Sequence, residues 1–143
     1  MAELCSLLID VVDSGASVGF LPPLDRDAAT DYWRSVIEAI SEGRRVLLVA
    51  PERSLIQGAV QLDLEMRANG NHRAEAMKLF VHRRARRRGL AKALLAELEA
   101  VARRLGRSLL VKDTRKGGEV PNYARSASGQ LHTTVFFYRP LDL

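Results

Sequence analysis

The residues with the clearest chemical potential are five arginines that stand together immediately before a glycine. They are Arg83, Arg84, Arg86, Arg87 and Arg88, and Gly89 follows them. An apolar helical pattern starts directly after the glycine, so the arginines crowd a helix end whose unpaired N–H groups already carry a partial positive charge. A bound anion would offset this repulsion, and the glycine would let the backbone approach a phosphate closely. The pattern indicates a phosphate-binding turn, with a solvated basic turn as the alternative.

The arginine turn must be held by the elements on either side of it. Short apolar runs predict strands at Ala76–Val81 and Ser108–Lys112, as expected for strands buried in a parallel sheet. Between them a helical stripe predicts a helix that closes at Gly106. The stripe consists of Leu90, Leu94, Leu98, Val101 and Leu105. We therefore take residues 74–114 as a βαβ crossover that carries the turn.

Two more helices are predicted ahead of this unit. Apolar spacing favours helices at Ala2–Val12 and Ala28–Ser41, and Asp25 or Asp27 can cap the second one. We expect the second helix to bury one stripe, which is Tyr32, Val36, Ile37 and Ile40. The loop Gly15–Asp25 between the helices carries apolar side chains at its centre. These either pack beneath the loop or form one wall of a substrate site.

The remaining segments read as strands, and they define the fold class. The predicted strands are Arg45–Ala50, Ile56–Met66 and, after a turn at 126–130, Leu131–Tyr138. The first two run antiparallel into the crossover, and the segment after Thr114, with Gly117, Gly118 and Pro121, changes character. The expected fold is α/β (α+β), a mixed and mostly antiparallel sheet around a central βαβ unit, in one domain at residues 1–143.

The segment Arg86-Arg87-Arg88-Gly89-Leu90-Ala91, between a predicted strand and a helix, resembles the Arg/Gln-x-x-Gly-x-Gly/Ala signature of the GCN5-related N-acetyltransferase (GNAT) superfamily. The resemblance implies that this loop wraps the pyrophosphate of acetyl-CoA and that the preceding strand pairs with the pantetheine arm. The implied cofactor-binding residues are Leu79, Phe80, Val81, Arg86, Arg87, Arg88, Gly89, Leu90, Ala91 and Lys92.

Further segments, including GASVGF and GEVPNYARSASGQLHTTVFFYRPL, look like the tabtoxin-resistance-type acetyltransferases, which acetylate small amines. Compared with that branch, the chain lacks the usual first strand and the fourth helix. The fourth helix would lie close to Gly117. We infer an internal deletion there of roughly fifteen or more residues, since a short helix and its return strand need about that many.

The resemblance also suggests which side chains do the chemistry. Acetyl transfer to an amine needs a group that removes a proton from the ammonium and a group that protonates the departing thiolate. Asp113, at the end of the second crossover strand, and Glu75, at the start of the first, are the candidate bases. The family draws its usual general-acid tyrosine from the missing helix. Tyr123 is an outside candidate for the acid, because the shortened connection must carry it close to the end of the second strand. The deletion is therefore expected to impair transfer.

Two other function classes remain open from the sequence. The chain could be an inactive relative that keeps the cofactor site, with its bared sheet edge covered by a second copy in a homodimer. It could also bind nucleic acid or another partner through the arginine turn. We expect no specific nucleic-acid binding, because outside the five arginines the chain has 17 Lys+Arg and 17 Asp+Glu, and only 6% of its residues are aromatic.

Composition limits the remaining possibilities. The single cysteine, Cys5, excludes an internal disulfide and is expected to be a buried thiol. His72, His82 and His132 lack the spacing of metal ligands, so no metal is expected. No apolar run approaches the roughly 18 residues of a membrane span, and the start lacks the basic lead of a signal peptide. A cytoplasmic location without membrane attachment is expected.

Overall fold

The computed structural model describes residues 1–16, 18–125 and 131–141, so the turn predicted at 126–130 lies outside the described residues. Five strands form one sheet in the order β1-β2-β3-β4-β5. Their bounds are Arg45–Glu52 for β1, Leu55–Leu64 for β2, Arg73–Val81 for β3, Leu109–Arg125 for β4 and Leu131–Pro140 for β5. Only β3 and β4 pair in parallel, and the other neighbours are antiparallel. The mixed, mostly antiparallel sheet predicted from the sequence is confirmed.

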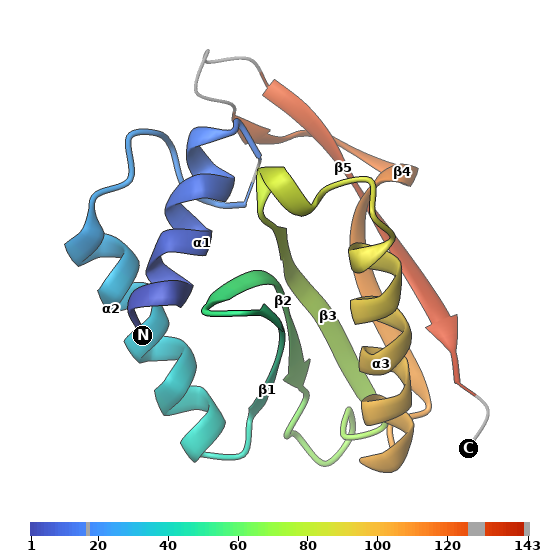
Figure 1. Ribbon diagram of the computed structural model, residues 1–143. Helices are drawn as coiled ribbons and strands as arrows, with labels where there is room; N and C mark the ends of the chain where they lie inside the picture. Colours follow the sequence, from blue (N-terminus) through green and yellow to red (C-terminus); the bar gives the residue numbers. More distant parts are fainter. Residues whose placement is uncertain (17, 126–130, 142–143) are drawn as a thin grey trace.

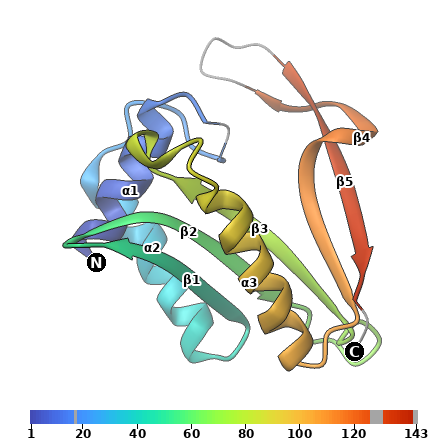
Figure 2. The ribbon, with the colours of Figure 1, turned by 45° about the vertical axis from the view of Figure 1, so that its right-hand side comes forward.

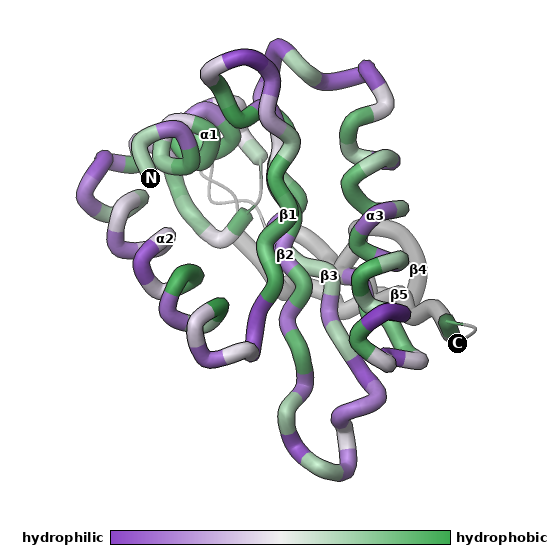
Figure 3. Tube along the Cα trace, turned by 60° about the horizontal axis from the view of Figure 1, so that its bottom comes forward, coloured by the Kyte–Doolittle hydropathy of each residue, from purple (hydrophilic) through white to green (hydrophobic). Residues whose placement is uncertain are grey.

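In the described residues, three α-helices cover the two faces of this sheet (Figure 1). Helices α1 (Ala2–Asp13) and α2 (Arg26–Ser41) lie on one face, and α3 (Leu90–Arg104) lies on the other, so the sheet is the middle layer in Figure 3. Alternation along the strands supplies both interfaces. In β2, for example, Ala59 packs with α1 and α2, whereas Val60 and Leu62 pack with α3. Strand β3 is the middle strand of the sheet, as expected for a central βαβ unit.

Helix ends follow the expected capping chemistry. The Asp25 carboxylate accepts a hydrogen bond from Ala28 N at 2.7 Å, which satisfies one of the unpaired amides of α2. Gly106, with φ of 71°, follows the last residues of α3, and its amide donates to Arg103 O at 2.9 Å. Cys5 is buried, as expected, with its sulfur 3.5 Å from Thr30 Oγ1.

The buried side of α2 differs from the predicted stripe. The buried residues are Ala29, Trp33, Val36 and Ala39. Ile37 and Ile40 are exposed by 47% and 37%. Trp33 takes the central position of the helix interface and packs edge-on against Phe80 of β3, with ring centroids 6.0 Å apart. Because this large ring turns inward, the isoleucines one position further round the helix face outward.

Strand β4 is also longer than predicted, because it continues past Thr114 to Arg125. Its partner β5 runs antiparallel beside it, with register shifts between Thr114 and Glu119 and between Val120 and Ala124. The glycines and Pro121 fall within these two irregular intervals, where bulges tolerate such residues. Pairing with β5 gives this segment the hydrogen-bond partners that its composition alone did not suggest. Among the described residues, no helix follows α3.

The predicted stripe of α3 is confirmed except at its end. Leu98 is fully buried against the sheet, whereas Leu105 is 46% exposed because the helix has already ended at Arg104. We therefore expect Leu98→Ala to lower the free energy of unfolding by about 2–5 kcal/mol, through lost apolar burial and a residual cavity. Leu105→Ala, directly after the end of the helix, is the matched control and should change it by less than about 0.5 kcal/mol. Urea denaturation of both variants measures the difference, and equal losses would contradict the assigned burial.

Candidate active site

Strands β3 and β4 separate after a short stretch of pairing. They are in register from Arg73 opposite Leu109 to Ala76 opposite Lys112, and then diverge, as Figure 2 shows. Within the described part of the chain, the rest of β3, residues 77–81, pairs with β2 alone. On its other side this segment presents backbone N–H and C=O groups that have no β4 partner. We call this opening the split; an extended ligand could pair with β3 there as an added strand.

The local structure of β3 adapts it to the split. Lys78 has a positive φ of 53°, and the β2–β3 register shifts between Ala59 and Gln61, so the strand bulges at this point. The predicted cofactor-strand residues lie directly after the bulge. Phe80 is fully buried towards α1 and α2, and Leu79 packs with the α3 cluster. Their side chains belong to the core, so this segment, through Val81, can meet a ligand through its backbone.

The arginine turn connects the end of β3 to the start of α3. It forms a short 3-10 helix, Arg83–Ala85, and then passes through Arg87 with φ of 60° to Gly89 with φ of 79°. The first backbone hydrogen bond at the start of α3 runs from Ala93 N to Gly89 O, at 3.0 Å. The amides of Leu90, Ala91 and Lys92 therefore precede the hydrogen-bond ladder of the helix, and the first turn contains no acidic residue. These donors suit an anion such as pyrophosphate.

The arginine side chains are arranged differently from the sequence interpretation. Arg83 forms an ion pair with Asp10 of α1, and its backbone amide donates to the same carboxylate at 2.9 Å. Arg86 donates to Ser14 Oγ and to Val81 O. These bonds fasten the turn to the end of α1. The mutual repulsion inferred from the sequence is therefore offset in part by groups of the protein itself, rather than by a bound anion alone.

Arg88 pairs with Glu52 at the end of β1, not with α1. Its guanidinium donates to both Glu52 oxygens, at 3.1 and 3.3 Å, and the hydrogen bond from Arg88 holds the pKa of Glu52 below its usual value. Both side chains are exposed, so this pair stabilises the fold little. Beside it, a hollow of about 310 Å³ lies between the β1–β2 turn and the start of α3. Arg84 and Arg87 have no ion-pair partner among the described side chains.

The loop between α1 and α2 is fastened to the same strand. Lys78 Nζ at the bulge donates to Val18 O at 2.7 Å, and Phe20 meets Tyr32 edge-on with ring centroids 5.2 Å apart. Val18 and Phe20 pack against the α1–α2 core, whereas Leu21 is 56% exposed. The packing interpretation of this loop therefore holds for its inward-facing residues, and the loop lies next to the split.

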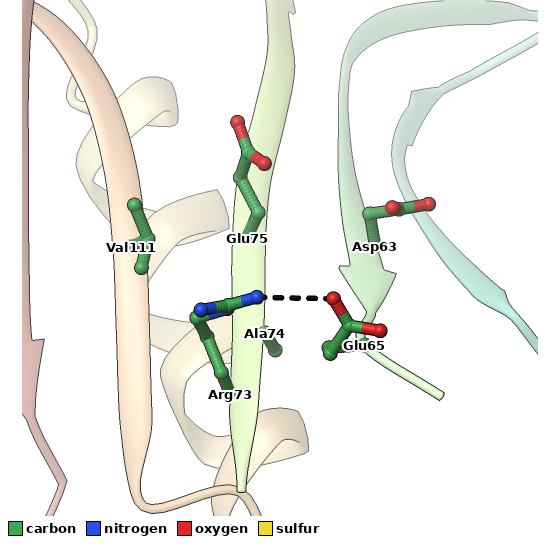
Figure 4. Close-up of a pocket in the computed structure, with 6 residues that line it drawn as sticks. All are labelled: Asp63, Glu65, Arg73, Ala74, Glu75 and Val111. Atoms are coloured by element: carbon green, nitrogen blue, oxygen red, sulfur yellow. Dashed lines mark hydrogen bonds and ion pairs between the residues drawn. The ribbon is translucent and has the colours of Figure 1, made fainter. Parts of the chain in front are cut away.

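Glu75 lines a second hollow, of about 260 Å³, on the face of the sheet opposite α3 (Figure 4). Its register partners are Asp63 on β2 and Val111 on β4, one position before the split opens. In Figure 4 the Glu75 carboxylate extends along β3 away from Arg73, in the direction of the split. The structure thus brings one predicted catalytic carboxylate to the vertex of the split.

The other walls of this hollow carry charges of both signs. Asp63 pairs with Arg45 at 2.7 Å, and Glu65 pairs with Arg67 at 2.6 Å and with Arg73 at 3.0 Å. The hydrogen bonds from Arg67 are the main reason that the pKa of Glu65 lies well below its usual range. The sequence interpretation missed this group. The alternation of charged residues along two neighbouring strands was the available signal, because alternate positions share one face of a sheet.

The second predicted base, Asp113, follows Lys112, the last β4 residue that pairs with β3. Its backbone therefore stands at the vertex of the split on the strand opposite Glu75. The side chains of Asp113 and of Tyr123 lie outside the described residues.

Among the described residues, no group of three or more metal-binding side chains occurs, and no helix is long and apolar enough to cross a membrane.

Comparison with known proteins agrees with this geometry. A model of the acetyltransferase (GNAT) family matches residues 16–119. An uncharacterized N-acetyltransferase in the hisH–hisA intergenic region of Azospirillum brasilense is 33% identical over 116 residues, which is 80% of this chain and 67% of that protein.

Solved structures share the fold at low sequence identity. An N-acetyltransferase from Staphylococcus aureus Mu50 is 16% identical, with a TM-score of 0.80 over 99% of this chain and 92% of the other. The protein yncA from Salmonella typhimurium, solved with its cofactor acetyl-CoA, is 19% identical, with a TM-score of 0.78 over 99% of this chain and 88% of the other.

Proposed function

Because the chain belongs to the acetyltransferase (GNAT) family, whose members use acetyl-CoA, we propose that it transfers the acetyl group to the amine of a small molecule in the cytoplasm. The observation that carries the proposal is the split between β3 and β4, which leads from the amides at the start of α3 to the Glu75 hollow. The unpaired edge of β3 and a carboxylate-lined hollow thus lie next to each other, which supports the proposal.

The residues proposed to hold the cofactor are those whose backbone groups are available. The amides of Gly89, Leu90 and Ala91, at the positive end of α3, would bind the pyrophosphate, together with the neighbouring arginines and Lys92. Residues Leu79–Val81 would pair with the pantetheine arm through their backbone. When bound, acetyl-CoA supplies a thioester whose acetyl carbon forms a bond to the amine nitrogen while its bond to sulfur breaks.

We propose Glu75 as the base that takes the proton from the acceptor ammonium, directly or through a water molecule. Its position in the hollow, one position before the split, supports this role more directly than the sequence did. Asp113 is the alternative base, from the opposite strand. The thiolate needs one proton to leave as a thiol, and Tyr123 stays a candidate donor.

The closest branch is proposed to be the tabtoxin-resistance type, with an internal deletion after Gly117. In the described residues β4 runs on from Thr114 without an intervening helix. If the usual proton donor is lost with that helix, transfer should be slow, because a general acid typically contributes about 10²–10⁴ in rate. Acetyl-CoA binding should persist, since the turn and the β3 edge are both present.

Thermal melting with and without acetyl-CoA tests the cofactor site, and thiol release with a panel of amines tests transfer. At a hundred times its dissociation constant, the cofactor should stabilise the fold by about 2.7 kcal/mol, which raises the melting temperature by several degrees.

Clustered arginines should also give weak, salt-sensitive binding to nucleic acid that CoA displaces. Binding of RNA that survives physiological salt and ignores excess CoA would favour the nucleic-acid function instead.

A further inference from the structure

The hollow at Glu75 has a charge arrangement that selects among amines. Arg73 and Glu75 are two positions apart on β3, so they share one face with Cα atoms about 6.5 Å apart. Arg73 lies further from the split than Glu75, and Figure 4 shows its guanidinium across the hollow between Val111 and Glu65. A ligand that enters here meets a carboxylate on the side of the split and a guanidinium beyond it.

Arg73 retains hydrogen-bonding capacity in this position. Glu65 accepts three hydrogen bonds from Arg67, through its backbone amide, Nε and one terminal nitrogen, and only one from Arg73. A guanidinium has five N–H donors. Among the described residues, the Arg73 side chain donates one hydrogen bond, to Glu65, and this side chain is 43% exposed. Glu65 therefore orients the Arg73 guanidinium and leaves other N–H donors of this group for a ligand.

The charges argue against a diamine or a polyamine as acceptor. A second ammonium group would be repelled by the Arg73 guanidinium. Two nearby carboxylates already have cationic partners, because Asp63 pairs with Arg45 and Glu65 pairs with Arg67. A molecule that carries a carboxylate on the carbon next to its amine fits better. Its carboxylate can take the forked donors of Arg73, and its amine then points along β3 towards Glu75 and the split.

From this arrangement we propose that the acceptor is a free α-amino acid or a close analogue, with Arg73 as the residue that binds its carboxylate. The inference rests on the proposed acetyl transfer and adds the class of acceptor. Arg73 fixes which end of the acceptor faces the split, so it determines specificity without taking part in proton transfer.

The test compares L-amino acids with their α-carboxamides, which keep the amine and lose the carboxylate charge, and with a linear diamine. We expect kcat/KM to be about 10- to 100-fold higher for the amino acids, because hydrogen bonds between charged groups are the strong ones. Arg73→Gln should bring the ratio close to one by raising KM for the amino acids only, and Arg73→Lys should restore it in part. Arg34→Gln is the control, since it removes an exposed arginine that pairs with Asp31 on α2 and lies outside the hollow.

Calorimetric titration of amino acids into the CoA-saturated protein separates this inference from the proposed function. If no amine is acetylated although acetyl-CoA binds, the proposed transfer fails, and the titration still decides the acceptor class. Binding that is lost in Arg73→Gln, while the CoA-induced melting shift is kept, supports the assignment. Equal use of amino acids and carboxamides, a preference for the diamine, or no binding of any amino acid would overturn it.

Discussion

Replacing Glu75 by Gln is expected to slow acetyl transfer by about 10²–10⁴-fold while acetyl-CoA binding stays unchanged. The substitution keeps the shape of the side chain but removes its basicity, so the acceptor amine would have to lose its proton to bulk water. Steady-state kcat for the preferred amine, followed by thiol release, measures the effect. The rate should also lose the part of its pH dependence that reports this base.

Two companion variants make the result specific. Glu97→Gln makes the same change on the exposed face of α3, where Glu97 pairs with Arg104 at 3.0 Å, and should leave kcat unchanged. Asp113→Asn tests the alternative base on β4. If Asp113→Asn abolishes transfer while Glu75→Gln retains it, the base is Asp113, and Glu75 only lines the acceptor hollow.

Ala91→Glu should remove the stabilisation by acetyl-CoA, about 2.7 kcal/mol at a hundred times the dissociation constant, without harming the free protein. Ala91 is the second residue of α3, where a carboxylate interacts favourably with the helix dipole. The melting temperature of the free variant should therefore stay the same or rise. The same negative charge would repel a pyrophosphate at these amides, so cofactor binding and stability of the free protein should change in opposite directions.

Ala96→Glu supplies the control for this experiment. It adds the same charge to an exposed position of α3, more than a turn beyond the unpaired amides. Its melting shift with acetyl-CoA should match that of the unaltered chain. A normal shift in Ala91→Glu would mean that the cofactor phosphates lie elsewhere, for example in the hollow beside Arg88 and Glu52.

The sequence predicted the parts of the molecule that depend on local patterns. The βαβ unit could be read from two apolar runs and one helical stripe, and the turn from Gly89, which adopts the left-handed conformation that glycine favours. Asp25 was recognisable as a cap, since capping is a contact between neighbours in the chain. Both candidate carboxylates were found because each lies next to a predicted strand.

The rest depends on contacts between residues far apart in the chain. Nothing near Arg83 indicates that Asp10 binds it, because that contact exists only once α1 lies beside the turn. The rotation of α2 follows from the fit of Trp33 against Phe80. Arg73 was not singled out as a candidate because its proposed role depends on the orientation that Glu65 gives it. The secondary-structure propensities of single residues and the spacing of apolar residues contain none of this information.

The short pairing between β3 and β4 also bears on the order in which the chain acquires its structure during synthesis. Only residues 53 and 54 join β1 to β2, and residues 65–72 join β2 to β3, whereas β4 reaches β3 after the whole crossover. Closing a longer segment costs more conformational entropy, and here only the four paired positions between β3 and β4 offset that cost. Because the N-terminal part leaves the ribosome first, the three-stranded meander is expected to fold before β4 is available. The pairing between β3 and β4 therefore forms after the meander, and the same short pairing that leaves the split open would leave room for the proposed cofactor.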